Sequence, residues 1–108
     1  MERIDPGKAR EIVKNALSEV ADFTGDFENY SFKQFKPFHT KVFLNSIREQ
    51  VIKTPCSDDA GNVVTEEYFD IDLSQTLWKK WDVIRECVDY VAASHYRVSG
   101  NTVRLQLP

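Results

Sequence analysis

The chain has 108 residues, of which 42% are hydrophobic and 29% charged, and its formal net charge is −3 at pH 7. This balance is typical of a folded domain with its own core, and it excludes both a disordered tail and a protein that holds duplex DNA through a general basic field. No apolar run is long enough to cross a bilayer, and no signal peptide opens the sequence. Cys56 and Cys87 are isolated thiols that suit a reducing compartment. We therefore expect one soluble, cytoplasmic domain over residues 1–108 that makes no membrane contact.

Two amphipathic helices are expected in the first half of the chain. Asp5 followed by Pro6 is typical of a helix start, because aspartate caps the first turn and proline costs nothing at the first helical position. Apolar residues at helical spacing then predict a helix over about 6–22, and a second stripe predicts one over 39–52. The segment 27–37 is rich in aromatic side chains but has no sustained period, so we predict a loop there.

A turn and a long strand should follow the second helix. Residues 57–62 have the composition of a turn, since aspartate, glycine and asparagine tolerate the backbone angles that turns need. Apolar and polar residues then alternate over 63–73, which predicts a half-buried strand. Residues 53–56 could pair with that strand across the turn.

The last part of the sequence predicts one long helix and a closing hairpin. From Ser74 to about Ser94 the apolar positions recur in steps of three and four residues, which indicates a single unbroken helix. These positions are Leu77, Trp81, Ile84, Val88 and Val91. The pair Gly100-Asn101 suits a tight turn between the β-prone segments 96–98 and 102–105, so the chain should end in a hairpin.

These elements predict an α+β domain in which three helices pack on a small antiparallel sheet with a C-terminal β-hairpin. An alternative fold is an acyl-carrier-like helical bundle with a β insertion. The two folds disagree about residues 65–69, which are a strand in the first and a helix in the second. They also disagree about Trp81, where only the second fold breaks the last helix and lets Asp82 cap a new one.

The alternative comes from a short sequence pattern in the second half of the chain. The pattern consists of Phe69-Asp70, Asp72-Leu73 and Asp89-Tyr90-Val91, and its spacing needs no insertion or deletion to match. This pattern resembles the second half of an acyl carrier protein, where an acidic helix end and Phe-Asp lead into a short helix and a last helix. The resemblance implies a helical bundle and a protein that docks on enzymes of acyl metabolism.

The chain departs from the carrier pattern at its functional residue. In the family, Asp-Ser-Leu opens the second helix, and the serine hydroxyl receives phosphopantetheine. Here that place reads Phe38-His39-Thr40-Lys41, and about 14 extra residues surround the turn near Gly61. The resemblance therefore implies a degenerate carrier-like protein that has lost its carrier chemistry, and no cofactor is expected.

No residue pattern points to catalysis or to a metal. His39, His95, Cys56 and Cys87 are scattered along the chain, whereas zinc ligands cluster at short spacings. Asp58 and Asn62 lack the spacing of a calcium-binding loop and are expected to form a turn. We therefore predict a protein that is not an enzyme and holds no metal, and we expect Cys87 to lie in the core.

A binding surface is predicted around residues 31–41, where phenylalanines alternate with lysines. Lysine beside an aromatic ring is the combination with which proteins hold single-stranded nucleic acid, but the same rings can anchor a loop on the core. Trp78 stands off the apolar stripe of its helix and is a second candidate anchor. The candidate surface comprises Phe35, Lys36, Phe38, His39, Lys41 and Trp78.

From these features we predict a binding domain whose partner is another protein. Single-stranded nucleic acid is the alternative partner, held by the loop 31–41. The edge of the closing hairpin could also pair two copies of the chain into a homodimer.

Overall fold

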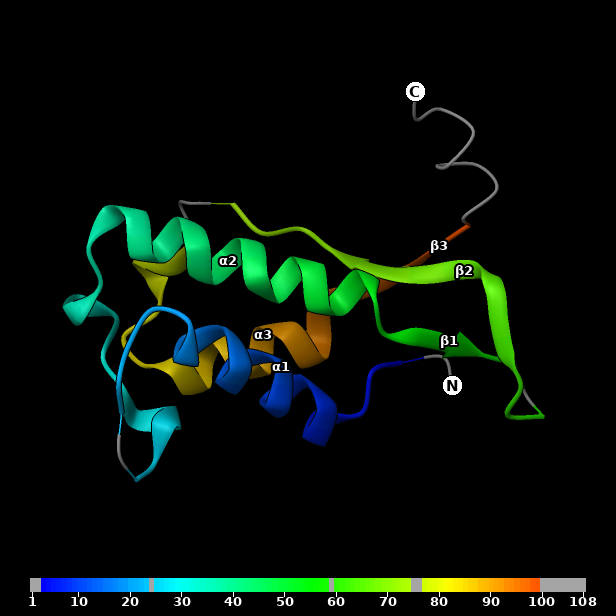
Figure 1. Cartoon of the computed structure of the whole chain (residues 1–108), viewed down its shortest axis with the longest axis horizontal. Helices are drawn as coiled ribbons and strands as arrows, with labels where there is room; N and C mark the ends of the chain where they lie inside the picture. The colour runs from blue at the N-terminus through cyan, green and yellow to red at the C-terminus, as the bar shows by residue number, and fades with distance from the viewer. Residues whose placement is uncertain (1–2, 24, 59, 75–76, 100–108) are drawn as a thin grey trace.

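The computed structural model describes residues 3–23, 25–58, 60–74 and 77–99. Over these residues the protein has the predicted α+β architecture, with three α-helices, three short 3-10 helices and an antiparallel sheet (Figure 1). None of the helices in this part of the chain is both long and apolar enough to cross a membrane. The elements are α1 (Pro6–Ser18), η1 (Phe27–Asn29), η2 (Phe32–Gln34), α2 (Pro37–Ile52), β1 (Pro55–Ser57), β2 (Val63–Ile71), η3 (Leu77–Lys80), α3 (Ile84–Ser94) and β3 (His95–Ser99).

The sheet is built around β2, which pairs antiparallel with β1 on one side and with β3 on the other. The predicted pairing across the turn is confirmed, although β1 starts at Pro55 and its register shifts between Pro55 and Cys56. The carboxylate of Asp58 closes the turn by accepting hydrogen bonds from the backbone of Ala60 and Asn62. The first arm of the predicted closing hairpin is β3, whereas its second arm, 102–105, lies outside the described residues.

The core lies between the helices and one face of the sheet. Helix α1 packs against both α2 and α3, and α2 packs against β2, as the arrangement in Figure 1 shows. Cys87 lies in this core, as predicted, and Cys56 is buried as well. The largest fully buried apolar side chains are Phe32, Phe43, Phe69, Ile12, Leu17, Ile47, Ile71, Ile84, Val13, Val51 and Val91.

The first two helices form where the sequence predicts them, with shifted ends. Asp5 caps α1 by accepting a hydrogen bond from the backbone of Gly7 at 2.9 Å. The helix ends at Ser18 and not near residue 22, because the backbone turns there and Glu19 donates to the carbonyl of Ala16. Helix α2 begins two residues early, at Pro37, whose ring is already set for the first helical position.

The prediction of one unbroken helix from Ser74 to Ser94 is wrong. The backbone of Asp82 accepts a hydrogen bond from Phe32, and Ile84 donates one to Tyr30, so residues 82–84 pair with the segment 30–32 instead of continuing a helix. The carboxylate of Glu86 accepts from the backbone of Asp82 and Val83, which caps α3.

This break is the one that the carrier-like alternative expects near Trp81. The same alternative expects a helix over 65–69, and there the structure has strand β2 instead. Each fold therefore describes one of the two disputed segments correctly, and the α+β class is the one that holds for the described chain.

Candidate binding surface at the start of helix α2

A cluster of buried aromatic rings fixes the segment that leads into α2. The ring of Phe32 lies edge-on to Phe35 at 5.4 Å and to Phe43 at 5.8 Å between centroids, and Trp81 packs on it at 5.6 Å. Phe35 also contacts Tyr30. The predicted loop over 27–37 is therefore a well-packed segment with two 3-10 turns, and it holds the start of α2 against the core.

Phe35, predicted as part of the binding surface, belongs to this cluster instead. Its side chain is only 9% exposed, and its ring contacts Phe43 as well as Phe32. Phenylalanine is a large apolar side chain, so a site among other rings is strongly favoured over contact with water. Phe35 therefore positions the surface without forming part of it.

Phe38 lies on the solvent-facing side of α2. It is 61% exposed, and Val42, one helical turn further on, is 44% exposed. Residues four positions apart are neighbours on a helix surface, so these two side chains make one exposed apolar pair. Val42 was not predicted from the sequence, although its spacing from Phe38 and its place outside the apolar stripe of α2 indicate it.

His39 connects the exposed pair with the backbone at the start of α2. Its ring lies 4.0 Å from that of Phe38 between centroids and 6.5 Å from that of Phe35. Its Nδ1 accepts a hydrogen bond from the backbone of Lys36 at 3.3 Å. His39 is half-buried, so it contributes one edge to the surface and holds the first turn of the helix.

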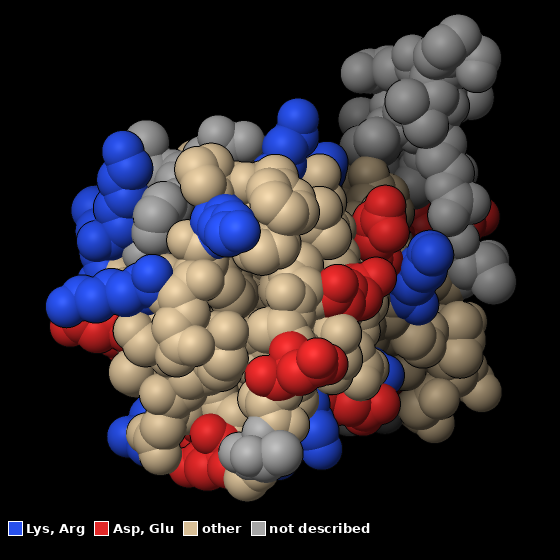
Figure 2. Space-filling view, turned by 60° about the vertical axis from the view of Figure 1, so that its left-hand side comes forward, with Lys and Arg blue, Asp and Glu red and all other residues tan. Residues whose placement is uncertain are grey.

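Three exposed lysines, Lys33, Lys36 and Lys41, surround the apolar pair. The sequence has no acidic residue between Glu28 and Glu49, and no carboxylate in the described part of the chain pairs with these lysines. Figure 2 turns this end of the molecule forward and shows uncharged surface with lysine and arginine side chains mainly at the left and top and acidic side chains mainly at the centre, right and bottom. We call Lys33, Lys36, Phe38, His39, Lys41 and Val42 the α2 surface.

Two further residues of interest in the sequence are Trp78 and Thr40. The side chain of Trp78 lies outside the described residues, and its backbone belongs to η3. Thr40, which stands where an acyl carrier has its serine, is only 2% exposed, because it faces the core side of α2. A modifying enzyme could not reach the Thr40 hydroxyl in this fold.

The opposite end of α2 is joined to the sheet by an ion pair. Arg48 donates to both carboxylate oxygens of Asp70, at 3.0 and 3.1 Å, and the backbone of Ile71 donates to the same carboxylate. Burial alone would raise the pKa of Asp70, but these hydrogen bonds and the charge of Arg48 outweigh it and hold that pKa below its ordinary value. Asp70 is thus a satisfied structural carboxylate.

The thiols and acidic groups do not assemble a reactive centre in the described residues. Burial raises the pKa of Cys87, and it also raises the pKa of Cys56, so both thiols are held in their protonated form. Over the same ranges, no three histidine, cysteine or acidic side chains gather as a metal site would require. Both thiols are therefore buried and protonated in the described part of the chain.

Comparison of the chain with protein-family models, with curated proteins and with solved structures gave no match.

Proposed function

We propose that this chain is a protein-binding domain that holds an acidic, apolar segment of another protein on the α2 surface. The observation that carries the proposal is the pair Phe38 and Val42, exposed side by side on α2 among lysines that have no described acidic partner. The same segment buries Phe32 and Phe35, so its exposed phenylalanine is not the result of a loose loop.

The apolar pair supplies the affinity in this proposal. Burying apolar surface stabilises a complex by about 25 cal/mol per Å², and aromatic side chains in the centre of an interface carry a large share of binding energy. Phe38 sits on a helix that is fixed by the packing of Phe43 and Phe35 beneath it. Little conformational freedom of the α2 backbone is lost when a partner covers Phe38.

The lysines supply the choice of partner. Lys33, Lys36 and Lys41 make this end of α2 locally basic in a chain whose net charge is −3. Charges at the rim of an interface mainly speed the association of oppositely charged partners and repel partners of the same sign. They add less to the affinity itself. A partner segment should therefore place aspartate or glutamate on both sides of its apolar residues.

Single-stranded nucleic acid fits the α2 surface less well. Base stacking along a strand uses successive exposed rings, and the structure buries Phe35, the second ring of the predicted platform. Phe38 alone offers one stacking position. Nucleic acid is therefore an outcome of the test and not the partner we propose.

The test is site-specific photocrosslinking in the cell that naturally makes the protein, with p-benzoylphenylalanine in place of Phe38. Val63 is a matched control position, because it is also 61% exposed but lies on β2. We expect a protein adduct from position 38 that is missing from position 63. The purified adduct partner should then bind the F38A variant at least about tenfold more weakly than the wild type and bind V63A unchanged.

Salt and charge reversal sharpen the same experiment. Affinity for the purified partner should fall with ionic strength, and the K36E and K41E variants should slow association. An RNA adduct at position 38, or the same adducts from positions 38 and 63, would contradict the proposal.

A further inference from the structure

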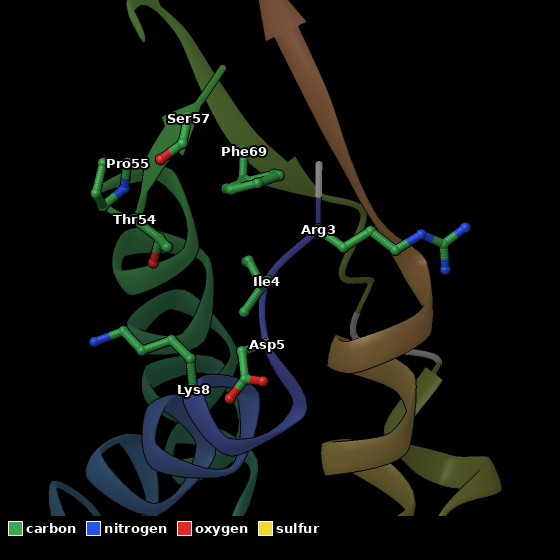
Figure 3. Close-up of a pocket in the computed structure, with 8 residues that line it drawn as sticks. All are labelled: Arg3, Ile4, Asp5, Lys8, Thr54, Pro55, Ser57 and Phe69. Atoms are coloured by element: carbon green, nitrogen blue, oxygen red, sulfur yellow. The ribbon is translucent and has the colours of Figure 1, made fainter. Parts of the chain in front are cut away.

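A second site lies at the other end of the molecule, where the chain enters α1. A cavity of about 230 Å³ opens there between the first turn of α1, the end of α2 and strand β2. Figure 3 shows side chains from all three directions converging on it, with Ile4 and Phe69 at its centre. None of the residues of the α2 surface takes part.

The walls of the cavity are largely apolar. Ile4 and Phe69 are buried side chains that form its floor, and the ring of Pro55 forms one side. Thr54 adds a hydroxyl that already donates to the carbonyl of Gln50 at 2.9 Å, so its oxygen keeps the capacity to accept. Such walls fit a compact apolar group of a few carbon atoms better than a polar one.

One ammonium group at the rim can pair with an anion. The Lys8 side chain starts at the edge of the cavity in Figure 3 and its ammonium group points outward, and its only ion pair with a described residue is a 3.9 Å contact with the exposed Glu11. The carboxylate of Asp5 already accepts from the backbone of Gly7 and is balanced by the positive end of α1. Arg3 also lines the cavity, but its guanidinium group points away from the other lining side chains in Figure 3.

A hydrogen bond to a residue far along the chain holds Ile4 in place. The backbone of Ile4 donates to Nε2 of His95 at 2.8 Å, and Nδ1 of His95 lies 2.8 Å from the carbonyl of Val91. Because Nε2 accepts, the ring proton is on Nδ1, and it is donated to Val91. The ring of His95 also lies edge-on to Phe69. His95 therefore contacts both Ile4 and Phe69, the two buried residues at the floor of the cavity.

We propose that this cavity binds a small carboxylate with a compact apolar body, such as a short branched or aromatic acid. The apolar body would rest on Ile4 and Phe69, and the carboxylate would face the ammonium group of Lys8. The proposal is independent of the α2 surface.

The test uses benzoate as the probe and follows the amide and methyl signals of the labelled protein by NMR. Benzamide keeps the ring but lacks the charge, and acetate keeps the charge but lacks the ring. We expect saturable shifts at Ile4, Lys8, Thr54 and Phe69 with a dissociation constant in the millimolar range, and weaker binding of both comparison compounds.

The variant K8Q tests the charge, with K14Q as its control on the exposed face of the same helix. K8Q should weaken benzoate binding about threefold to fivefold, the size expected for one partly exposed ion pair, and K14Q should leave it unchanged. Shifts that never saturate, shifts that scatter over the surface, equal binding of benzamide, or an unchanged affinity in K8Q would each overturn the proposal.

Discussion

The two ends of the molecule are held together by different forces. At the helical end, which comprises η1, η2, the first half of α2 and the start of α3, aromatic rings pack on one another around Phe32. At the sheet end, polar contacts add to the burial of Phe69 and Ile71; they join Arg48 with Asp70, Arg97 with Glu67, and the backbone of Ile4 with His95.

The two ends also differ in the exposed apolar surface that a partner protein could cover. At the sheet end the charged side chains pair with one another, and the exposed apolar side chains, Val63 and Tyr96, lie on different strands. The rings of the helical end fill the core and leave Phe38 with Val42 in water. Apolar surface that the fold does not bury is where a partner gains most.

The largest effect should follow from removing the centre of the ring cluster. The F32A variant should lose about 3–5 kcal/mol of the free energy of unfolding, because a buried phenylalanine leaves a cavity among Phe35, Phe43 and Trp81. Chemical denaturation measures the loss. A loss of less than about 1 kcal/mol, as surface positions show, would mean that the rings do not hold the helical end.

A smaller loss is expected at the sheet end from D70N. This variant keeps the shape of Asp70 but removes the charge that Arg48 and the backbone of Ile71 face, and it should cost about 1–2 kcal/mol. The control is D89N, because Asp89 is exposed on α3.

The pH dependence of stability checks the same carboxylate. The pKa of Asp70 is lowered in the folded state, so its contribution is fully present above the ordinary pKa of an aspartate. It is lost as the pH falls through the lower, folded-state pKa. Wild type and D70N should therefore differ at neutral pH and converge in acid, and a constant difference would contradict this role.

The support beneath Ile4 should have a similar or slightly smaller effect. The H95A variant removes the acceptor of the Ile4 amide and should cost about 1 kcal/mol, with faster hydrogen exchange at that amide. An unchanged exchange rate at Ile4 in a folded H95A variant would show that the contact does not hold the segment.

The cap of α3 should give the smallest of these losses. E86A removes the acceptor for the backbone of Val83 and Asp82 and should cost about 0.5–1 kcal/mol. E86Q retains a side-chain oxygen and should recover most of that loss. If both variants are equally destabilised, the charge of Glu86 matters and not its capping hydrogen bonds.

The sequence predicts the elements whose signals are local. The cap at Asp5, the turn at Asp58 and the strand β2 each follow from neighbouring residues, and the structure confirms all three, although Phe69, Asp70 and Ile71 are all buried where alternation was expected. The end of α1 and the break before α3 depend on backbone contacts, and the break pairs residues 82–84 with 30–32. Periodicity cannot reveal such a pairing, because the apolar stripe continues through it.

The sequence predicts only part of the α2 surface, because local patterns do not show which side chains the core buries. Lys36, Phe38, His39 and Lys41 follow from the alternation of rings and lysines and lie on the α2 surface. Which phenylalanine faces the core is decided by packing, and this is why Phe35 was assigned to the wrong side. The cavity at Ile4 joins residues 3–8 to residues about fifty or more positions further along the chain, and no local pattern indicates it.

The most direct test of the account measures stability and binding together in the F38A variant. If Phe38 serves a partner and not the fold, its free energy of unfolding should stay within about 0.5 kcal/mol of the wild type, while its affinity for the crosslinked partner falls at least about tenfold. A stability loss like that of F32A, or an unchanged affinity, would contradict the account.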